Sequence, residues 1–152
     1  MSEVSEVSEV SEVSEVSEVS EHTTIITGAS AGIGRATAEQ LAAEGHRVIG
    51  LARRPVSDFP GIYIEVDLAD EAATAAALEQ VLAAHKVDGL INNVGLVRPA
   101  PLADITLSDL REVYDLNVRC TVQCSQAVVP GMIAGGYGRI VNIASLVTSG
   151  VP

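Results

Sequence analysis

Short apolar runs rich in β-branched residues alternate with longer segments of helical periodicity along residues 22–152. This alternation is typical of βαβ units, in which helices connect parallel strands. It predicts five strands: Thr23–Thr27, Arg47–Leu51, Ile62–Val66, Gly89–Asn93 and Arg139–Ser145. We therefore expect an α/β fold, with a doubly wound parallel sheet of order 3-2-1-4-5 in three αβα layers.

The first two helices are predicted from their periodicity and their end signals. Between the first two strands, the residues spaced by four are Ile33, Thr37 and Leu41, with Ala36 beside them, and Gly45 supplies a stop. The second helix is Ala-rich, has Asp70 as its predicted N-cap and ends near His85. Three of its residues are predicted to face inward: Leu78, Val81 and Leu82.

A third helix is predicted to begin at a capping box, Thr106–Asp109, and to run towards Pro130. Cys120 and Cys124 lie on one face of it because they are four residues apart. Two cysteines are too few for a disulfide framework, so we expect small buried core residues. A metal or redox role is the alternative, and no metal site is predicted.

The N-terminal segment is a tandem repeat in which Ser-Glu-Val recurs from Ser2 to Val19. In a helix each Val would lie 300° from the last, and in a strand successive Val residues would face opposite sides. Neither structure buries the valines together. Residues 1–21 are therefore predicted to be a disordered tail, with an acidic interaction tail or an isolated helix as the alternative, and residues 22–152 to be the folded domain.

The charge is acidic and unevenly distributed. The formal net charge is −11, but 7 of the 20 carboxylates lie in the first 21 residues, and the chain has one Lys. A nucleic acid is therefore not an expected partner. The N-terminus is acidic rather than basic, and no apolar run reaches the ~18 residues of a membrane span, so a cytoplasmic protein without a membrane partner is expected.

A glycine-rich segment, Thr27–Arg35, lies where the first strand turns into the first helix. Gly28 allows a tight turn, Gly32 lets the backbone approach a phosphate, and Gly34 permits close packing of helix on strand. The helix N-terminus then favours a pyrophosphate. A merely tight turn is the alternative for this segment alone, and a nucleotide triphosphatase loop is disfavoured because the Gly-Lys-Ser/Thr ending is absent.

Over residues 22–152 the sequence resembles the short-chain dehydrogenase/reductase family. Gly28 to Gly34 is similar to its cofactor turn, Asp67 to its adenine-contacting acidic residue, and Asn92-Asn93-Val94-Gly95 to its Asn-Asn-Ala-Gly segment, with Val94 replacing Ala. The resemblance implies a Rossmann-like domain, incomplete on its C-terminal side, whose expected cofactor contacts are Gly28, Ser30, Gly32, Ile33, Gly34, Arg53, Asp67, Leu68, Asn93 and Gly95.

The cofactor is predicted to be NADP(H) rather than NAD(H). Related NAD enzymes commonly place a carboxylate at the end of the second strand, where it would repel a 2′-phosphate. This chain has Ala52 followed by Arg53 and Arg54. A guanidinium suits a phosphate by charge and geometry, so we assign the contact to Arg53 and expect Arg54 to be solvated.

The resemblance also implies two catalytic residues: Asn117, which matches the Asn of a proton relay through water, and Ser145, which matches the serine that hydrogen-bonds the substrate oxygen. The family's Tyr-x-x-x-Lys pair is missing, since neither Tyr114 nor Tyr137 has a Lys four residues on. We expect a family oxidoreductase acting on a small carbonyl or alcohol, with this chain alone inactive. The complete enzyme is expected to be a homo-oligomer. The alternative is a non-catalytic nucleotide-binding or interaction module.

Overall fold

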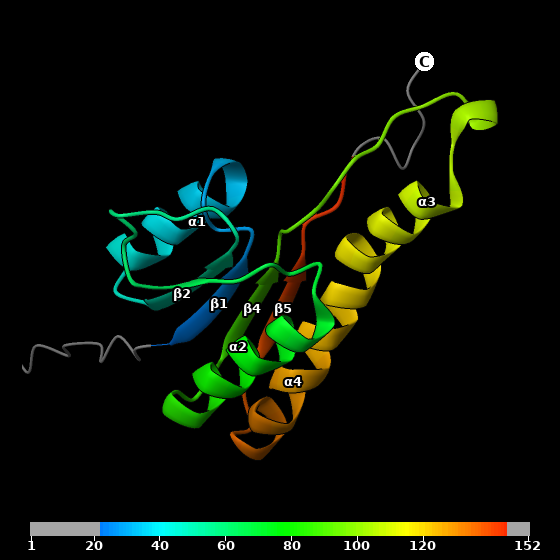
Figure 1. Cartoon of the computed structure of the whole chain (residues 1–152). Helices are drawn as coiled ribbons and strands as arrows, with labels where there is room; N and C mark the ends of the chain where they lie inside the picture. The colour runs from blue at the N-terminus through cyan, green and yellow to red at the C-terminus, as the bar shows by residue number, and fades with distance from the viewer. Residues whose placement is uncertain (1–21, 146–152) are drawn as a thin grey trace, which may run out of the picture.

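Parallel strands with helices on both faces make up the part of the chain that a computed structural model describes, residues 22–145 (Figure 1). The predicted Ser-Glu-Val tail lies outside these residues. The elements in chain order are β1 (Thr23–Thr27), α1 (Gly32–Ala43), β2 (Arg47–Ala52), β3 (Ile62–Glu65), α2 (Glu71–Ala84), β4 (Gly89–Asn92), η1 (Leu102–Asp104), α3 (Leu107–Tyr114), η2 (Asp115–Arg119), α4 (Cys120–Ala134) and β5 (Arg139–Asn142).

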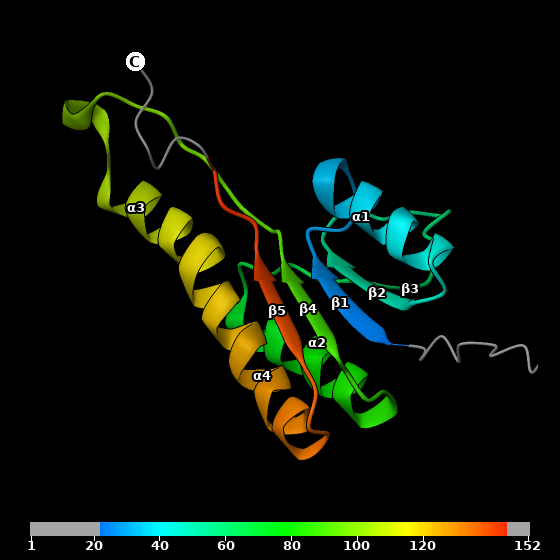
Figure 2. The ribbon, with the colours of Figure 1, turned by 180° about the vertical axis from the view of Figure 1, so that it is seen from behind.

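The sheet has the order β3-β2-β1-β4-β5, and every neighbouring pair is parallel. Helix α1 covers one face, and α2 and α4 cover the other (Figures 1 and 2). The predicted Rossmann-like fold, its strand order and its three layers are therefore confirmed. None of the helices in residues 22–145 is long and apolar enough to cross a membrane.

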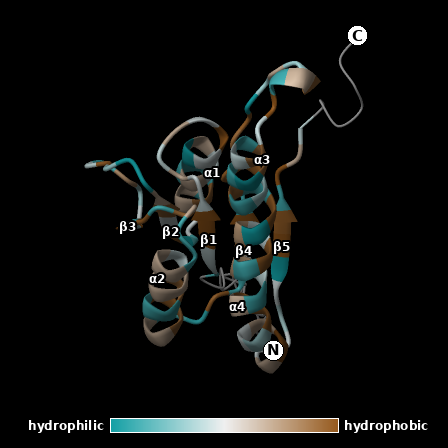
Figure 3. Cartoon of the chain, turned by 45° about the vertical axis from the view of Figure 1, so that its right-hand side comes forward, coloured by the Kyte–Doolittle hydropathy of each residue, from teal (hydrophilic) through white to brown (hydrophobic). Residues whose placement is uncertain are grey.

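Alternate side chains of the central strands point to opposite faces, so the two halves of the core come from neighbouring residues. Ile25 packs in the larger cluster under α2 and α4, whereas Ile26 packs in the smaller cluster under α1. Both are fully buried, as expected for a parallel strand covered on both sides. Hydrophobic residues accordingly run along the strands, while the helices are mixed (Figure 3).

The face that α1 buries differs from the predicted one. Ile33 is 62% exposed and Ala36 is also exposed, whereas the buried residues are Gly34 and Ala38. The prediction holds for Leu41, which packs against the cluster under α1, and is wrong for Ile33 and Ala36, because the helix approaches the sheet most closely through its smallest residues. A Cβ on Gly34 would lie 2.6 Å from the carbonyl oxygen of Gly28, so the close approach requires glycine there.

The two predicted helix caps are confirmed. The Asp70 carboxylate accepts a hydrogen bond from the Ala73 N–H at the start of α2, and Thr106 and Asp109 form a reciprocal capping box at the start of α3. As predicted, Leu78 and Val81 are buried and Leu82 packs against them.

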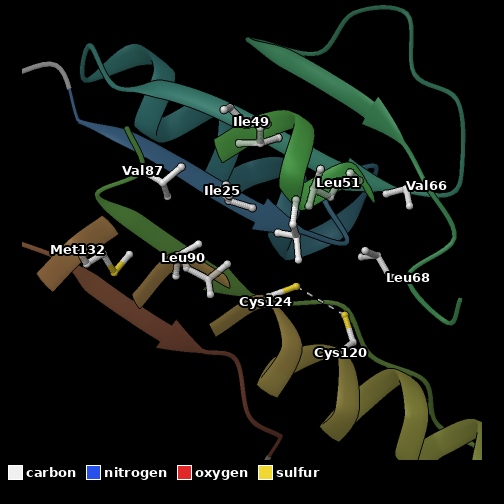
Figure 4. Packing of buried hydrophobic residues seen from close by; sticks show 14 residues of the cluster. Ile25, Ile49, Leu51, Val66, Leu68, Val87, Leu90, Cys120, Cys124 and Met132 are labelled. Carbon is white, nitrogen blue, oxygen red and sulfur yellow. Dashed lines mark hydrogen bonds between the residues drawn. The ribbon is translucent and has the colours of Figure 1, made fainter. Parts of the chain in front are cut away.

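The third helical region is longer than predicted and is not a uniform α-helix. A five-residue π-helical segment, η2, joins α3 to α4, and α4 continues past Pro130 to Ala134. The buried stripe of α4 shows why: its members recur every four residues and end at Met132, beyond the proline, while Pro130 is exposed. Figure 4 shows Cys120 and Cys124 of this stripe facing the core, where they are fully buried as predicted, with their sulfurs 3.9 Å apart.

The carboxyl end of β5 stops short of the predicted Ser145. Strand β4 ends at Asn92, which pairs with Asn142, and the Ile143 N–H makes the last hydrogen bond between the two strands, to the Asn92 carbonyl at 2.9 Å. As expected for an edge strand, β5 is exposed along its length.

Candidate functional site

A cleft of about 290 Å³ lies at the carboxyl ends of the strands. This end of a doubly wound parallel sheet is where ligands bind in folds of this type. Its walls come from the turn after β1 and from the segments after β2, β3 and β4, and the lining residues include Gly28, Ser30, Arg53, Arg54, Asp67, Leu68, Ala69, Val94, Gly95, Leu96 and Glu112.

The glycine turn lines this cleft with Gly28 and Ser30. Gly28 has φ +67°, a left-handed conformation that favours glycine, and its N–H donates to the Leu51 carbonyl at 2.8 Å. A Cβ on Gly28 would lie 3.0 Å from both the Asn93 amide nitrogen and the Val94 backbone. The turn is therefore pressed against the segment after β4, and only glycine allows this approach.

Gly32 stands at the start of α1 and faces open space. Its φ is +57°, and an added Cβ would meet nothing within 4 Å. The N-cap residue, Ala31, has no side chain that caps the helix. The first N–H groups of α1 are thus left without a side-chain acceptor, an arrangement suited to an anion.

Thr27, which the sequence analysis did not select as a site residue, ties the end of β1 to the end of β4. Its side chain is fully buried, and its Oγ1 accepts hydrogen bonds from the backbone N–H groups of Asn93 (3.0 Å) and Val94 (3.1 Å). Its place directly before the glycine turn was the available signal for this role.

Asn93 was expected to contact the cofactor, but its side chain is engaged within the protein. The amide Nδ2 donates to the carbonyls of Thr27 and Gly28, each at 3.1 Å. These two hydrogen bonds anchor the glycine turn to the segment after β4.

Two arginines from the end of β2 border the cleft. The Arg53 side chain is 81% exposed, and its nearest charged neighbour is Asp67, with 3.9 Å between Nη1 and Oδ2. The Arg54 backbone is fixed because the Tyr63 hydroxyl donates to its carbonyl. Burial raises the pKa of Tyr63 above its usual range.

Asp67 follows β3 and faces the cleft with one of its two carboxylate oxygens. Oδ1 accepts the Ala69 N–H at 3.0 Å, which leaves Oδ2 on the side of Arg53. The carbonyls of the next two residues accept hydrogen bonds from Arg119 of η2, another residue that the sequence analysis did not identify.

Asn117 lies in η2 and braces the segment after β4. Its Nδ2 donates to the Leu96 carbonyl at 2.8 Å, and its Oδ1 accepts the Leu96 N–H at 2.7 Å. Both amide atoms are therefore committed to backbone. Nearby, Arg98 makes two hydrogen bonds to Glu112, at 2.9 and 2.8 Å, so the one glutamate bordering the cleft is already paired.

The structure brings six of the predicted residues together around the cleft: Gly28, Ser30, Arg53, Asp67, Leu68 and Gly95. The backbone around the cleft is supported by three further predicted residues, Gly34, Asn93 and Asn117. Two others, Gly32 and Ile33, are exposed at the start of α1. Ser145 is exposed beyond the end of β5 and does not border this cleft.

A larger groove of about 550 Å³ lies between α2 and α4, but its lining is almost entirely aliphatic. It lacks convergent polar groups, so the smaller cleft is the better candidate for a site with chemistry. Among residues 22–145, no group of three or more His, Cys, Asp or Glu side chains could hold a metal ion.

Comparison with known proteins places this geometry among dehydrogenases. The family model described as short chain dehydrogenase matches residues 22–151. The chain is 38% identical over 129 residues to the L-xylulose reductase of Homo sapiens, covering 80% of this chain and 52% of that protein. It is 35% identical over 132 residues to the 3-oxoacyl-(acyl-carrier-protein) reductase FabG of Escherichia coli, covering 81% and 54%.

A solved structure shares the arrangement as well. The 3-oxoacyl (acyl-carrier-protein) reductase of Agrobacterium tumefaciens with NADP bound superimposes with a TM-score of 0.76 at 32% identity, over 82% of this chain and 53% of that one. The chain spans about half the length of the curated relatives it matches.

Proposed function

The chain belongs to the short-chain dehydrogenase family, and from this premise we propose that it forms the NADP(H)-binding part of an oxidoreductase that acts on a small carbonyl or alcohol. Bound NADP(H) would supply or accept the hydride at its nicotinamide ring. The residues of this chain would bind and orient it, and Ser145 would hydrogen-bond the substrate oxygen.

The cleft and the adjoining start of α1 fit a dinucleotide by the distribution of their donors and acceptors. A pyrophosphate suits the open backbone at Gly32 and the uncapped N-terminus of α1. An adenine amino group suits the Oδ2 of Asp67, which no backbone N–H in the described part of the chain occupies. Asn93 and Asn117 would act by holding the surrounding backbone rather than by touching the cofactor.

The position of Arg53 is the single observation that carries the choice of NADP(H) over NAD(H). Its guanidinium is 81% exposed beside the cleft, and the ion pair with Asp67 is long, at 3.9 Å. A surface pair of this length contributes little, so the side chain is free to turn to a 2′-phosphate. The end of β2 offers Ala52 where a carboxylate would repel that phosphate.

The test is a titration of the Arg53→Ala variant with NADPH and NADH. We expect NADPH binding to weaken by about 1.5–3 kcal/mol, the scale of a hydrogen bond to a charged group, with NADH nearly unchanged. Arg54→Ala is the matched control, because it removes an adjacent positive charge at the same rim. Equal weakening of both cofactors by Arg53→Ala would refute the assignment.

Turnover should require groups that these 152 residues do not include. No Tyr in the sequence is followed four residues later by Lys. Serine is a poor proton donor at neutral pH, so Ser145 can orient a substrate oxygen but cannot replace a positioned acid. Such a group typically contributes 10²–10⁴-fold to a rate. We therefore propose that the chain by itself binds the cofactor without turning it over.

A further inference from the structure

Arg119 is a charged side chain that is mostly buried against the protein, whereas arginine usually lies in solvent. Its side chain is 17% exposed. Its Nη2 donates to two backbone carbonyls, Leu68 at 2.7 Å and Ala69 at 3.0 Å, which belong to the loop between β3 and α2. The same guanidinium donates through Nη1 to Gln123, whose own amide donates to the Glu71 carbonyl at 2.8 Å. Arg119 and Gln123, one helical turn apart, thus bind three carbonyls of this segment, an arrangement that we call the clamp.

The clamp fixes the direction of two peptide groups. In a trans peptide the C=O and the following N–H point in opposite directions. Since the Leu68 carbonyl points to Arg119, the Ala69 N–H must point away from it, and there it meets the Asp67 Oδ1 at 3.0 Å. In the next peptide the Ala69 carbonyl also points to Arg119, so the Asp70 N–H points away from it and donates to the Asp67 carbonyl at 3.0 Å.

The hydrogen bonds of Arg119 therefore support the peptide orientation that the Asp67 carboxylate uses. With Oδ1 occupied by the Ala69 N–H, the carboxylate presents Oδ2 to the cleft. Without Arg119 the Leu68 carbonyl would keep only the longer bond from the Thr74 hydroxyl, 3.4 Å, and the two peptides would be held less firmly. The hydrogen bond from the Ala69 N–H to the carboxylate would then open more often.

We propose that Arg119 is a positioning residue that orients Asp67 for recognition of the adenine end of the cofactor. It acts through the Leu68–Ala69 peptide and does not touch the cofactor. The same π-helical segment holds the opposite wall through Asn117 and Leu96, so η2 braces the two loops that flank the cleft. This inference rests on the proposed function.

The experiment uses Arg119→Met, which keeps the aliphatic stem and removes the donors. Arg111→Met on neighbouring α3 is the matched control, since it removes the same charge from an exposed position that does not border the cleft. Amide hydrogen exchange of the ligand-free chain is measured across residues 67–71. Titrations with NADPH and with adenosine 2′,5′-bisphosphate follow.

We expect exchange at Ala69 and Asp70 to become about tenfold faster in Arg119→Met, with the control unchanged. NADPH and adenosine 2′,5′-bisphosphate should weaken together by about tenfold, because the loss lies in the adenosine half. Reduced nicotinamide mononucleotide, which lacks that half, should bind both variants alike.

Unchanged exchange at Ala69 and Asp70 would overturn the inference, and so would a loss of NADPH affinity without a matching loss for adenosine 2′,5′-bisphosphate. Failure of the proposed function is a separate result: the wild-type chain would then bind neither ligand. The exchange measurement would still report whether Arg119 orders the loop.

Discussion

Replacing Thr27 with Val tests how the glycine turn is held in place. Valine has nearly the same shape, so no cavity forms, but the acceptor of the Asn93 and Val94 N–H groups is lost. A buried donor left without a partner costs about 1–3 kcal/mol. Both residues are half-buried, so water can compensate part of the loss. We expect the free energy of unfolding to fall by about 2–4 kcal/mol, a large share of the total for a small domain.

The assay is urea unfolding at neutral pH, in which the loss should move the midpoint by about 1–2 M for a typical slope. Thr74→Val is the control, because Thr74 is equally buried but its hydroxyl donates to two carbonyls that each have another donor: Asp70, which accepts the Thr74 N–H, and Leu68, which accepts from Arg119. We expect this control to lose less than about 1 kcal/mol. Equal losses for the two variants would refute the idea that Thr27 acts as an acceptor for the segment after β4.

Three further outcomes follow from the structure. Gly34→Ala should lower the free energy of unfolding by about 1–3 kcal/mol and weaken NADPH binding, because a Cβ would lie 2.6 Å from the Gly28 carbonyl oxygen. Gly131→Ala in α4 is the control, since its Cβ would meet nothing within 4 Å and the change should be neutral or stabilising. Burial alone would raise the pKa of Asp88, but the Thr23 N–H and a lysine outweigh it and hold this pKa below its ordinary value. The stabilisation is therefore present above the unfolded pKa of ~3.9 and lost as the pH falls, so in urea unfolding the gap between wild type and Asp88→Asn should close below about pH 4. Finally, the purified 152 residues should show no steady oxidation of NADPH with a panel of carbonyl compounds, and a family-like continuation bearing Tyr-x-x-x-Lys should restore it.

Local signals in the sequence were sufficient for the elements and for most of the cleft. Asp70 and Thr106 were identified as caps because each bonds a residue three positions away, a distance fixed by the helix itself. The positions of Gly28 and Arg53 followed from the strands that precede them, since the carboxyl ends of parallel strands meet at one edge.

Sequence patterns were insufficient where packing distance decided the outcome. The α1 face was assigned to its larger residues, and Leu41 does pack against the core, yet the fully buried positions are Gly34 and Ala38, because the helix lies too close to the sheet for bulk there. The extent of α4 beyond Pro130 likewise depended on whether Met132 would find a place in the core.

By itself, then, the sequence determined which segments become strands and helices and which end of the sheet carries the glycine turn, because periodicity and capping act between residues close together in the chain. Only the tertiary structure decided the roles of Arg119 and Asn93, since both bind carbonyl groups, at Leu68 and Gly28 among others. Because every residue has a backbone carbonyl, the sequence does not indicate which carbonyl a side chain will bind, and only the folded structure brings the two groups together.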